Sequence, residues 1–316
     1  MHSSYPKVLH ELAGVPLLGH VIAVAKSLVE KYGGRIRVVT GHGSDQIDPL
    51  VVEHGAEVVH QQEQLGTGHA LQIAMEGIGS DGQTLVLYGD VPLITEADIG
   101  PLISAGNTNL ALLTATVSDP AGYGRIIRDS SGDVVAIVED RDASESERTI
   151  CEINSGIYAA PTSLFQELLP LLTNVNSQNE YYLTDCVRLS VSSGRKVSGV
   201  EGAITATMGV NDRSQLAELN QLLQKKRRDT LMTAGVTLID PDTVHLNGTD
   251  IDIQPDTIIE PNVTLNSPVS IGSNVRIGFG SHLTDVVIGA NTVIKPYSVV
   301  ESATIGCDAQ IGPFTR

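Results

Sequence analysis

Tryptophan is absent from this 316-residue sequence, and aromatic residues make up only 3% of it. A hydrophobic core must therefore be built mainly from Val, Ile, Leu and Ala. Hydrophobic residues account for 41% and charged residues for 18%, which are ordinary shares for a globular protein. A chain of this length holds two domains, or one large domain with an appendage.

Basic residues are scarce, because 20 Lys and Arg stand against 37 Asp and Glu, which gives a formal net charge of -17. A strongly acidic surface repels nucleic-acid backbones and anionic membranes, so neither is expected as a partner. A small anionic ligand stays open wherever Lys, Arg, backbone N–H groups or a metal ion gather locally.

Cysteine is also rare, and Cys151, Cys186 and Cys307 lie far apart without a CxxC pair. This spacing argues against a disulfide framework or a metal site and favours buried thiols in a reducing compartment. No apolar run approaches the ~18–20 residues of a membrane span, and the first residues lack the apolar stretch of a secretory signal. The sequence therefore predicts a cytoplasmic protein.

Residues 16–213 alternate between helix-like and strand-like segments. Helices are expected at residues 17–32, 44–52 and 68–78, and strands at residues 35–40, 56–60 and 84–88. The last strand, TLVLY, is continuously apolar, as a strand buried on both faces of a parallel sheet would be. This alternation predicts a doubly wound α/β domain, in which ligands bind at the carboxyl ends of the strands. Tyr88, Gly89 and Asp90 follow such an end.

Two later segments have a different pattern. Residues 123–140 predict a β-hairpin with a Gly-containing turn, and residues 212–232 predict a helix with a stripe of leucines. The basic cluster at residues 225–228 suits the C-terminal half of that helix because of the helix dipole. We expect this cluster to face solvent, and a phosphate site is the alternative.

The clearest repeat begins after Gly235, where aliphatic residues recur six positions apart with two one-residue slips. The series consists of Ile253, Ile259, Leu265, Ile271, Ile277, Leu283, Ile288, Ile294, Val300, Ile305 and Ile311. This is the hexapeptide pattern of a parallel β-helix, with room for roughly three and a half coils. No capping element follows, so we expect Arg316 not to be the natural end of this architecture.

Asp90 is the strongest single candidate for chemistry, because a carboxylate at the end of a buried strand is a natural Mg²⁺ ligand. A helix or turn cap is the alternative. Lys7 offers a point charge for a phosphate, although a plain surface lysine has the same appearance. Glu139 and Asn154 flank the hairpin and have groups that bind sugar hydroxyls or an amide, or merely end strands.

The segment QQEQLGTGHA at residues 61–70 precedes a helix. Gly66 and Gly68 would allow backbone N–H groups to approach a base or phosphate, and the amide of Gln61 would read a base edge. A simple tight turn before a helix explains the two glycines equally well.

The order of the motifs carries more information than any one of them. They are PKVLHELAG at 6–14, EQLGTGHA at 63–70, LYGDVPL at 87–93, GYGRI at 122–126, IVED at 137–140, EINSGIY at 152–158, EYYLTD at 180–185 and GVND at 209–212. Over the whole chain this series resembles the bifunctional bacterial UDP-N-acetylglucosamine pyrophosphorylase / glucosamine-1-phosphate acetyltransferase family (GlmU type). That family has a nucleotidyltransferase domain followed by a left-handed hexapeptide β-helix.

The resemblance implies transfer of uridylyl from UTP to N-acetylglucosamine 1-phosphate, which supplies peptidoglycan and lipopolysaccharide synthesis. It implies these roles: Lys7 on the phosphates, Gln61, Gly66 and Thr67 on the uracil, Asp90 and Asn211 on Mg²⁺, Tyr88 and Gly89 lining nucleotide and sugar, and Gly124, Glu139, Asn154 and Thr184 on the sugar phosphate. It also implies a homotrimer formed through the β-helix. The implied domains are residues 1–213 for nucleotidyl transfer, 214–234 as a linker helix and 235–316 as β-helix.

The sequence departs from the family pattern at both ends. The family has a strand and a Gly-rich LAAGxGTRM loop ahead of the segment that here is HSSYPKVLH, with Met1 in place of the last loop residue. We therefore expect an unfilled slot in the sheet, poor or no activity, no acetyl-CoA activity and weakened trimerisation. Two alternatives remain: a nucleotidyltransferase for another hexose 1-phosphate, such as an ADP-glucose or dTDP-glucose pyrophosphorylase, and a non-catalytic subunit that binds sugar nucleotides.

Overall fold

The computed structural model describes residues 1 and 3–316 and divides the chain into two compact units. The first unit consists of Met1–Leu9 and Leu17–Val210, and the second of His10–Pro16 and Asn211–Arg316. The implied functional boundaries at residues 213 and 234 stay a prediction. None of the described helices is long and apolar enough to cross a membrane.

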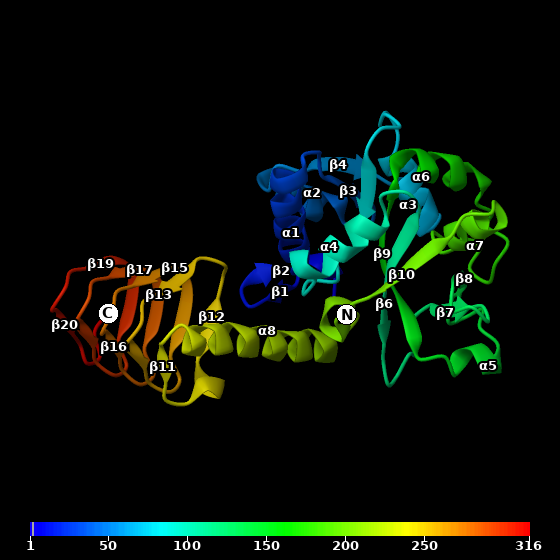
Figure 1. The fold of residues 1–316 in the computed structure, drawn as a ribbon. Helices are drawn as coiled ribbons and strands as arrows, with labels where there is room; N and C mark the ends of the chain where they lie inside the picture. Colours follow the sequence, from blue (N-terminus) through cyan, green and yellow to red (C-terminus); the bar gives the residue numbers. More distant parts are fainter. Residues whose placement is uncertain (2) are drawn as a thin grey trace. The chain divides into compact units, whose positions relative to one another are not determined.

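The first unit is built around a six-stranded sheet in the order β10-β6-β9-β7-β8, with β5 also paired to β9 (Figure 1). Its strands are β5 (Gln83–Val86), β6 (Leu110–Thr116), β7 (Arg125–Arg128), β8 (Val134–Val138), β9 (Glu152–Pro161) and β10 (Val197–Glu201). β6 and β9 form the centre, because nearly every residue of both is buried. The predicted hairpin is confirmed by the antiparallel pair β7–β8.

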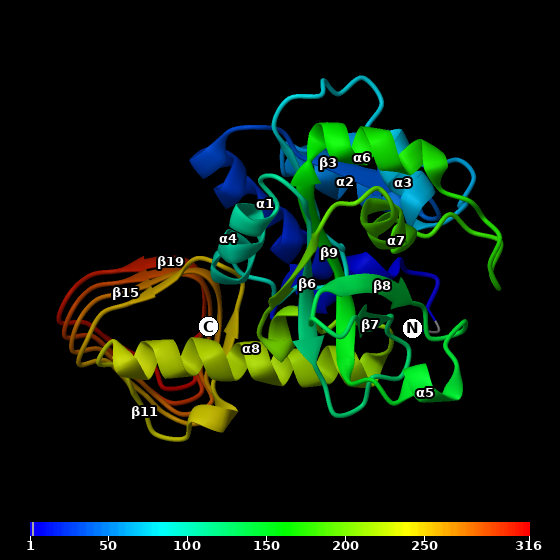
Figure 2. The same cartoon turned by 45° about the vertical axis from the view of Figure 1, so that its right-hand side comes forward.

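Helices pack on this sheet and on the smaller one beside it (Figure 2). They are α1 (Leu17–Tyr32), α2 (Ser44–Glu53), α3 (Thr67–Ala74), α4 (Glu96–Ala105), α5 (Glu145–Arg148), α6 (Thr162–Leu168) and α7 (Asp185–Ser192), with 3-10 turns η1 (Lys7–Leu9), η2 (Leu169–Leu171) and η3 (Ile204–Ala206). The prediction for α1 is confirmed at both ends. Its apolar face buries Leu18, Val21 and Ile22, as the helical spacing requires.

A second, two-stranded parallel sheet joins β3 (Arg37–Thr40) and β4 (Glu57–His60). No strand of the described residues lies between β3 and β5, and a cavity of about 1160 Å³ is lined by both strands and by α1 and α3. β3 and β5 run in the same direction along α3. Arg37, at the start of β3, donates to the carbonyls of Ala74 and Glu76 at the end of α3, and Thr84, near the start of β5, reaches Met75. Tyr88, just after β5, forms a hydrogen bond with Thr67 at the start of α3. One edge of β3 and one edge of β5 therefore face the cavity.

The cavity corrects one expectation from the sequence. Residues 84–88 are predicted as a strand buried on both faces, but all four residues of β5 are only half-buried. A continuously apolar run such as TLVLY is typical of a central strand that has a neighbour on each side. Among the described residues, β5 pairs on one side only, with β9.

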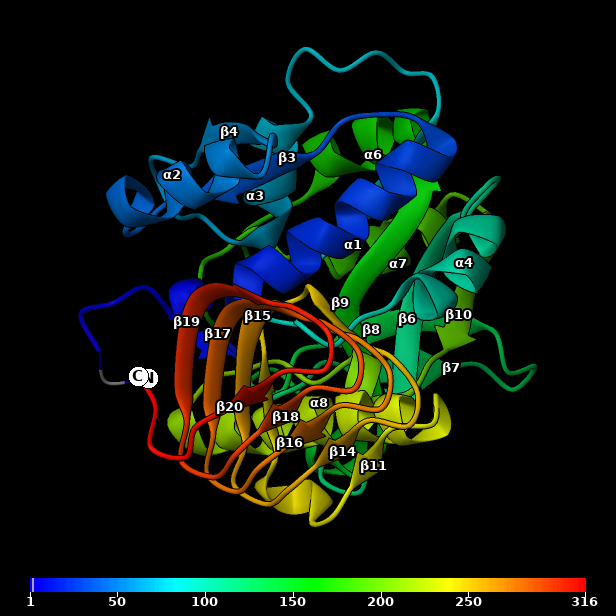
Figure 3. The ribbon, with the colours of Figure 1, turned by 90° about the vertical axis from the view of Figure 1, so that its left-hand side faces the viewer.

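The second unit contains the β-helix, whose coils nest against one another in Figure 3. Its strands are β11 (Thr237–Leu238), β12 (His245–Asn247), β13 (Ile251–Ile253), β14 (Ile258–Ile259), β15 (Thr264–Ile271), β16 (Arg276–Ile277), β17 (His282–Ile288), β18 (Val293–Ile294), β19 (Val299–Ile305) and β20 (Gln310–Ile311). The hexapeptide prediction is confirmed, because Ile259, Ile277 and Ile294 stack in register on one face and are fully buried. The first slip in the repeat is absorbed by a register shift between Asn266 and Val269.

The remaining elements of this unit are the long helix α8 (Arg213–Thr233), the 3-10 turn η4 (Pro241–Thr243) and the pair β1 (Glu11–Leu12) with β2 (Val15–Pro16). Asp212 caps α8 by accepting a hydrogen bond from the backbone N–H of Gln215 at 2.8 Å. The pair β1–β2 is fixed to this unit, since Ala13 N donates to Oδ1 of Asn220.

The basic cluster on α8 differs from the expectation. Lys225 is exposed and pairs with Asp229, as a solvated face would predict. Arg228, in contrast, is buried, and donates to the carbonyl of Val244 and to Asp242. Part of the cluster therefore holds the first coil, which the spacing of charges alone did not indicate.

Candidate active site

The carboxyl end of β5 carries the acidic residue that the sequence singles out. The strand ends at Val86, and a short turn leads to Asp90. Lys7, in η1, places its Nζ 2.5 Å from Oδ2 of Asp90, and the two side chains are 35% and 21% exposed. The backbone carbonyl of Asp90 accepts a hydrogen bond from Val210 at 3.0 Å. A cation and a carboxylate are thus held together where a ligand can reach them.

Gly89 sits in this turn for a steric reason. A Cβ at Gly89 would lie 3.1 Å from Cδ1 of Leu18 and 3.7 Å from Cγ1 of Val8. The chain therefore passes close to α1 and η1, and a larger residue would displace Asp90 from Lys7. Its contact with a nucleotide or sugar stays a prediction.

The glycines of residues 61–70 serve the packing of the protein itself. A Cβ on Gly66 would lie 2.7 Å from the carbonyl oxygen of Tyr181, and one on Gly68 would lie 2.5 Å from Cδ1 of Leu172. The N–H of Gly68 donates to the carbonyl of Tyr181 at 2.8 Å. The expectation that this N–H faces a base or phosphate is therefore wrong, while the role of Gly66 stays a prediction.

The side chain of Gln61 forms contacts across the loop at residues 61–70. Its Nε2 donates to the carbonyl of Gly66 at 3.1 Å and lies 3.1 Å from Nδ1 of His69. Thr67 begins α3, and its hydroxyl accepts a hydrogen bond from the backbone N–H of Leu183. Uracil recognition by Gln61 and Thr67 stays a prediction, but the loop that would carry it is well fixed.

Tyr88 links this loop to the rest of the site. Its ring lies on Gly156, where a Cβ would be 2.5 Å from Cε2. Burial raises the pKa of Tyr88 well above its usual range, and the charges of Glu139 and Asp90 raise it further, while a hydrogen bond with Thr67 lowers it. The phenol is therefore neutral and lies near both carboxylates.

Four of the predicted sugar-binding residues converge. A Cβ on Gly124 would lie 3.6 Å from Oε2 of Glu139 and 3.6 Å from Cβ of Asn154. The hydroxyl of Thr184 donates to Oε1 of Glu139 at 3.0 Å, and the carbonyl of Gly124 accepts from Asn154 N at 2.8 Å. Oδ1 of Asn154 accepts a hydrogen bond from the N–H of Gly156 at 3.1 Å. The Asn154 side chain also interacts with the buried phenol of Tyr158.

The environment of Glu139 is acidic and largely dry. Burial raises its pKa, and the neighbouring carboxylates of Asp142, Asp185 and Asp140 add to the rise, against a lowering by the hydrogen bond from Thr184. A carboxylate in such surroundings gains from a ligand that donates hydrogen bonds to it, as a sugar hydroxyl or amide does.

Asn211 lies in the second unit, where its backbone N–H donates to Oε1 of Gln215 ahead of α8. Its pairing with Asp90 around a metal ion stays a prediction. Asp90 fits a cation, because its carboxylate is part-exposed and already faces the ammonium of Lys7. Among residues 1 and 3–316, no cluster of three or more His, Cys, Asp and Glu could hold a metal. Mg²⁺ does not need one, since it takes most of its ligands from phosphates and water.

Tyr123 is a site residue that the sequence reasoning missed. Burial raises its pKa, a hydrogen bond with the backbone of Gly209 lowers it, and the charge of Asp90 raises it. The segment before β7 therefore reaches the Asp90 end of the site. Both residues lie in motifs quoted above, GYGRI and GVND, but no pattern in the sequence brings the two together.

Comparison with known proteins places the chain in a family. Residues 1–180 match the MobA-like NTP transferase domain, and residues 250–285 match the bacterial transferase hexapeptide (six repeats). The chain is 42% identical over 318 residues to the "Bifunctional protein GlmU" of Acinetobacter baumannii (strain ACICU), covering all of this chain and 69% of that protein. It is 43% identical over 322 residues to the protein of that name from Bordetella parapertussis, covering 100% and 70%.

An NTP transferase domain followed by hexapeptide repeats defines the chain as a nucleotidyltransferase. The chain belongs to the GlmU family of bifunctional proteins.

Proposed function

We propose that the first unit transfers uridylyl from UTP to N-acetylglucosamine 1-phosphate and releases pyrophosphate. The observation that carries this proposal is the convergence of Gly124, Glu139, Asn154 and Thr184, together with the Lys7–Asp90 pair beyond the end of β5. One group suits a hydroxylated, amide-bearing sugar and the other suits phosphates.

The proposed reaction uses one group of residues to bind the sugar and the other to bind the phosphates. An oxygen of the sugar phosphate attacks the α-phosphorus of UTP, an O–P bond forms, and the bond from that phosphorus to the leaving pyrophosphate breaks. Lys7 neutralises phosphate charge, and Glu139 and Asn154 orient the sugar through hydrogen bonds. Mg²⁺, which Asp90 with Asn211 would hold, supplies further charge neutralisation when bound. The reaction needs no covalent nucleophile.

Membership of the family supports two further proposals, on uracil binding and on oligomeric state. Gln61, Gly66 and Thr67 would hold the uracil, and the hexapeptide repeats would form a homotrimer. We assign uridylyl transfer to the first unit, because the described site residues other than Asn211 lie there. UTP and the sugar phosphate are cytoplasmic metabolites in this scheme, so we place the protein in the cytoplasm.

We also propose that turnover by these 316 residues is low while no strand of the described residues lies between β3 and β5. Asp90 lies in the turn after β5, and among the described residues β5 is paired along one edge only, with β9. A strand held on one side shifts more readily, and small displacements at a reacting centre cost large factors in rate.

The test is pyrophosphate release with UTP or ATP, each combined with N-acetylglucosamine 1-phosphate or glucose 1-phosphate, in the presence of Mg²⁺. We expect the highest turnover with UTP and N-acetylglucosamine 1-phosphate. Preference for ATP with glucose 1-phosphate would instead identify a different hexose-phosphate nucleotidyltransferase. Tight binding of UDP-N-acetylglucosamine with no turnover in any combination would favour the non-catalytic binding subunit.

A further inference from the structure

We propose that Arg125 is a positioning residue for the sugar half of the site. It ties the segment ahead of β7 to the turn after β8, so that Gly124 and Glu139 stay opposite one another. This inference rests on the proposed function, because it assigns Gly124 and Glu139 to the sugar.

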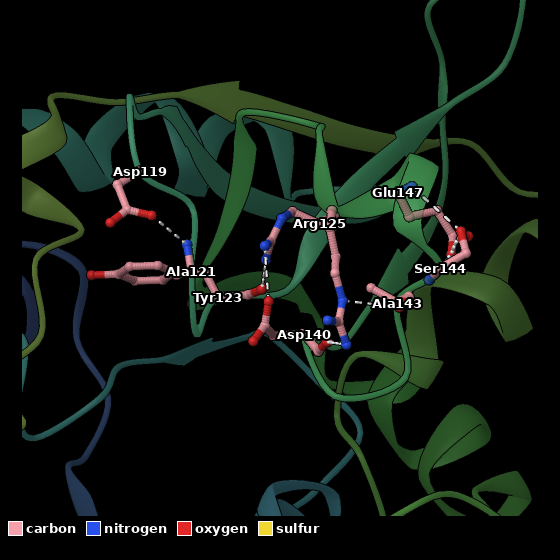
Figure 4. A network of polar contacts seen from close by, with 9 residues as sticks. Asp119, Ala121, Tyr123, Arg125, Asp140, Ala143, Ser144 and Glu147 are labelled. Atoms are coloured by element: carbon pink, nitrogen blue, oxygen red, sulfur yellow. Dashed lines mark hydrogen bonds and ion pairs between the residues drawn. The ribbon is translucent and has the colours of Figure 1, made fainter.

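Arg125 is a charged residue in the core. Its side chain is 2% exposed and is one of the largest fully buried side chains of the chain. Its Nη2 donates to Oδ1 of Asp140 at 2.8 Å, and its Nη1 donates to the carbonyl oxygen of Tyr123. Figure 4 shows the guanidinium of Arg125 joined by dashed lines to both partners. The planar fork of an arginine suits such a double contact, which a lysine cannot make with one ammonium.

The two partners of Arg125 are sequence neighbours of Gly124 and Glu139. Tyr123 immediately precedes Gly124, and Asp140 immediately follows Glu139. The bond to the carbonyl of Tyr123 fixes the peptide unit that joins directly to Gly124. The bond to the side-chain carboxylate of Asp140 holds the residue that directly follows Glu139. Without these bonds the segment before β7 and the turn after β8 would be coupled mainly through the short β7–β8 ladder.

The turn after β8 is also held from its other side. Arg148, at the end of α5, donates from Nε to the carbonyl of Ala143 at 3.1 Å and from Nη2 to the carbonyl of Asp140 at 3.3 Å. Ser144 and Glu147 begin the same helix with a reciprocal capping box. The turn is thus rigid in itself, and Arg125 is the link that sets its place relative to Gly124.

Stability alone does not account for an arginine at this position. A buried ion pair is weak evidence for stability, because desolvation offsets the attraction between the charges. The Nε of Arg125 is in addition buried with no hydrogen-bond partner among the described residues. An apolar side chain would avoid both costs, so the geometry of the two bonds is the better explanation.

Arg128 provides a matched control on the same strand. It forms two hydrogen bonds to the carboxylate of Glu152, at 2.7 and 2.6 Å, and one to the carbonyl of Gly132. Neither partner adjoins Gly124 or Glu139. Loss of Arg128 therefore removes an arginine and an ion pair from β7 without releasing the sugar half of the site.

The experiment compares calorimetric affinities for UDP-N-acetylglucosamine and for UDP, which share the nucleotide and differ in the sugar. In Arg125→Met we expect the affinity for UDP-N-acetylglucosamine to fall about tenfold or more while that for UDP stays within about twofold. Arg125→Lys should fall between, and Arg128→Met should match the unchanged chain. Asp140→Ala, at a side chain that is 34% exposed, should reproduce the selective loss if Arg125→Met does not fold.

Two results would overturn the inference: equal affinities in the folded Arg125 and Asp140 variants and the unchanged chain, or an equal loss for both ligands. If the unchanged chain binds neither ligand, the proposed function itself fails. Binding by the unchanged chain with no selective loss in the variants would reject the positioning role alone.

Discussion

At the scale of single residues, the site depends on glycines that allow other groups to pack closely. Gly156, in β9, has a φ of 82° and lies so close to the ring of Tyr88 that an added Cβ would be 2.5 Å from Cε2. This allows a tyrosine to stand between the Asp90 end and the Glu139 end of the site. The motif EINSGIY contains the glycine, but nothing in the sequence indicates which ring it receives.

Gly156→Ala should therefore displace Tyr88. We expect it to lower the free energy of unfolding by about 2–4 kcal/mol, from backbone strain at positive φ and from the clash with the ring. The matched control is Gly132→Ala, because Gly132 has φ 85 but nothing within 4 Å of the added Cβ. The control should cost only the strain, ~1–2 kcal/mol. Urea unfolding measures both, and equal losses would contradict the packing of Tyr88 on Gly156.

The pH dependence of stability should report on Glu139. Burial raises its pKa above the ordinary 4.5, so the carboxyl stabilises the fold fully at pH below that value and loses the contribution as pH rises through the folded pKa. Glu139→Gln, which keeps the oxygen that accepts from Thr184, should thus become more stable than the unchanged chain between acid and neutral pH. Unfolding measured across this range gives the difference.

Glu147→Gln is the control of opposite sign. Hydrogen bonds from the side chain and backbone of Ser144 lower the pKa of Glu147, so its contribution is present at neutral pH and is lost as pH falls through the folded pKa. This variant should be less stable than the unchanged chain at neutral pH and approach it in acid. The same trend in both variants would argue against the burial of Glu139.

At the scale of elements, the basic side chains of α8 differ in role: one is exposed to solvent and another is buried against the first coil. Arg228 is 8% exposed and spans from the helix to the carbonyl of Val244 and to Asp242. Lys225, three residues earlier, is exposed and bonds only within the helix, to Asp229. The helix therefore anchors the first coil through one basic residue of the cluster while its neighbour stays in water.

Arg228→Met should weaken this anchor by about 1–3 kcal/mol, because the carbonyl of Val244 loses its donor. Lys225→Met should change stability by less than about 1 kcal/mol, since an exposed pair contributes little. Hydrogen exchange of peptides from residues 236–265 is the local probe. Equal protection in the two variants would show that the basic cluster is a solvated face, as its sequence suggested.

Some elements could be predicted from the sequence and others could not, for a physical reason. The β-helix follows from local repetition, because most aliphatic residues at the six-residue spacing are buried inside the coils. Ile259, Ile277 and Ile294, which stack in register, belong to that series. The helices and the hairpin β7–β8 follow from periodicity. The half-buried state of β5 does not, because it depends on which strand lies beside it and not on its own residues.

The candidate site divides in the same way. Residues at strand ends, such as Asp90, and residues in recognised motifs, such as Glu139 and Asn154, could be named from the sequence. Their convergence with Thr184 could not, because it is made by segments far apart along the chain. The link through Arg125 was also missed, since a buried guanidinium between two loops has no sequence pattern.

At the scale of the whole molecule, a cavity of about 1160 Å³ is lined by residues of both β3 and β5. Amides along these two strands should exchange hydrogen faster than those of β6, which is paired on both edges. A chain extended ahead of Met1 by an aliphatic strand and a Gly-rich loop should slow that exchange, whereas the same extension with proline in the strand should not. Exchange in β3 and β5 as slow as in β6 without any extension would contradict an open edge.

The central claim is that the Lys7–Asp90 end of β5 is where uridylyl is transferred. Its most direct test is the rate of UDP-N-acetylglucosamine formation from UTP, N-acetylglucosamine 1-phosphate and Mg²⁺, in this chain and in the extended chain, each with and without Asp90→Asn. Asp98→Asn, in the capping box of α4, is the matched control. We expect Asp90→Asn to lower the rate by about 10²-fold or more and Asp98→Asn to leave it nearly unchanged. Product formation at an equal rate with Asp90→Asn would contradict the assignment of this site.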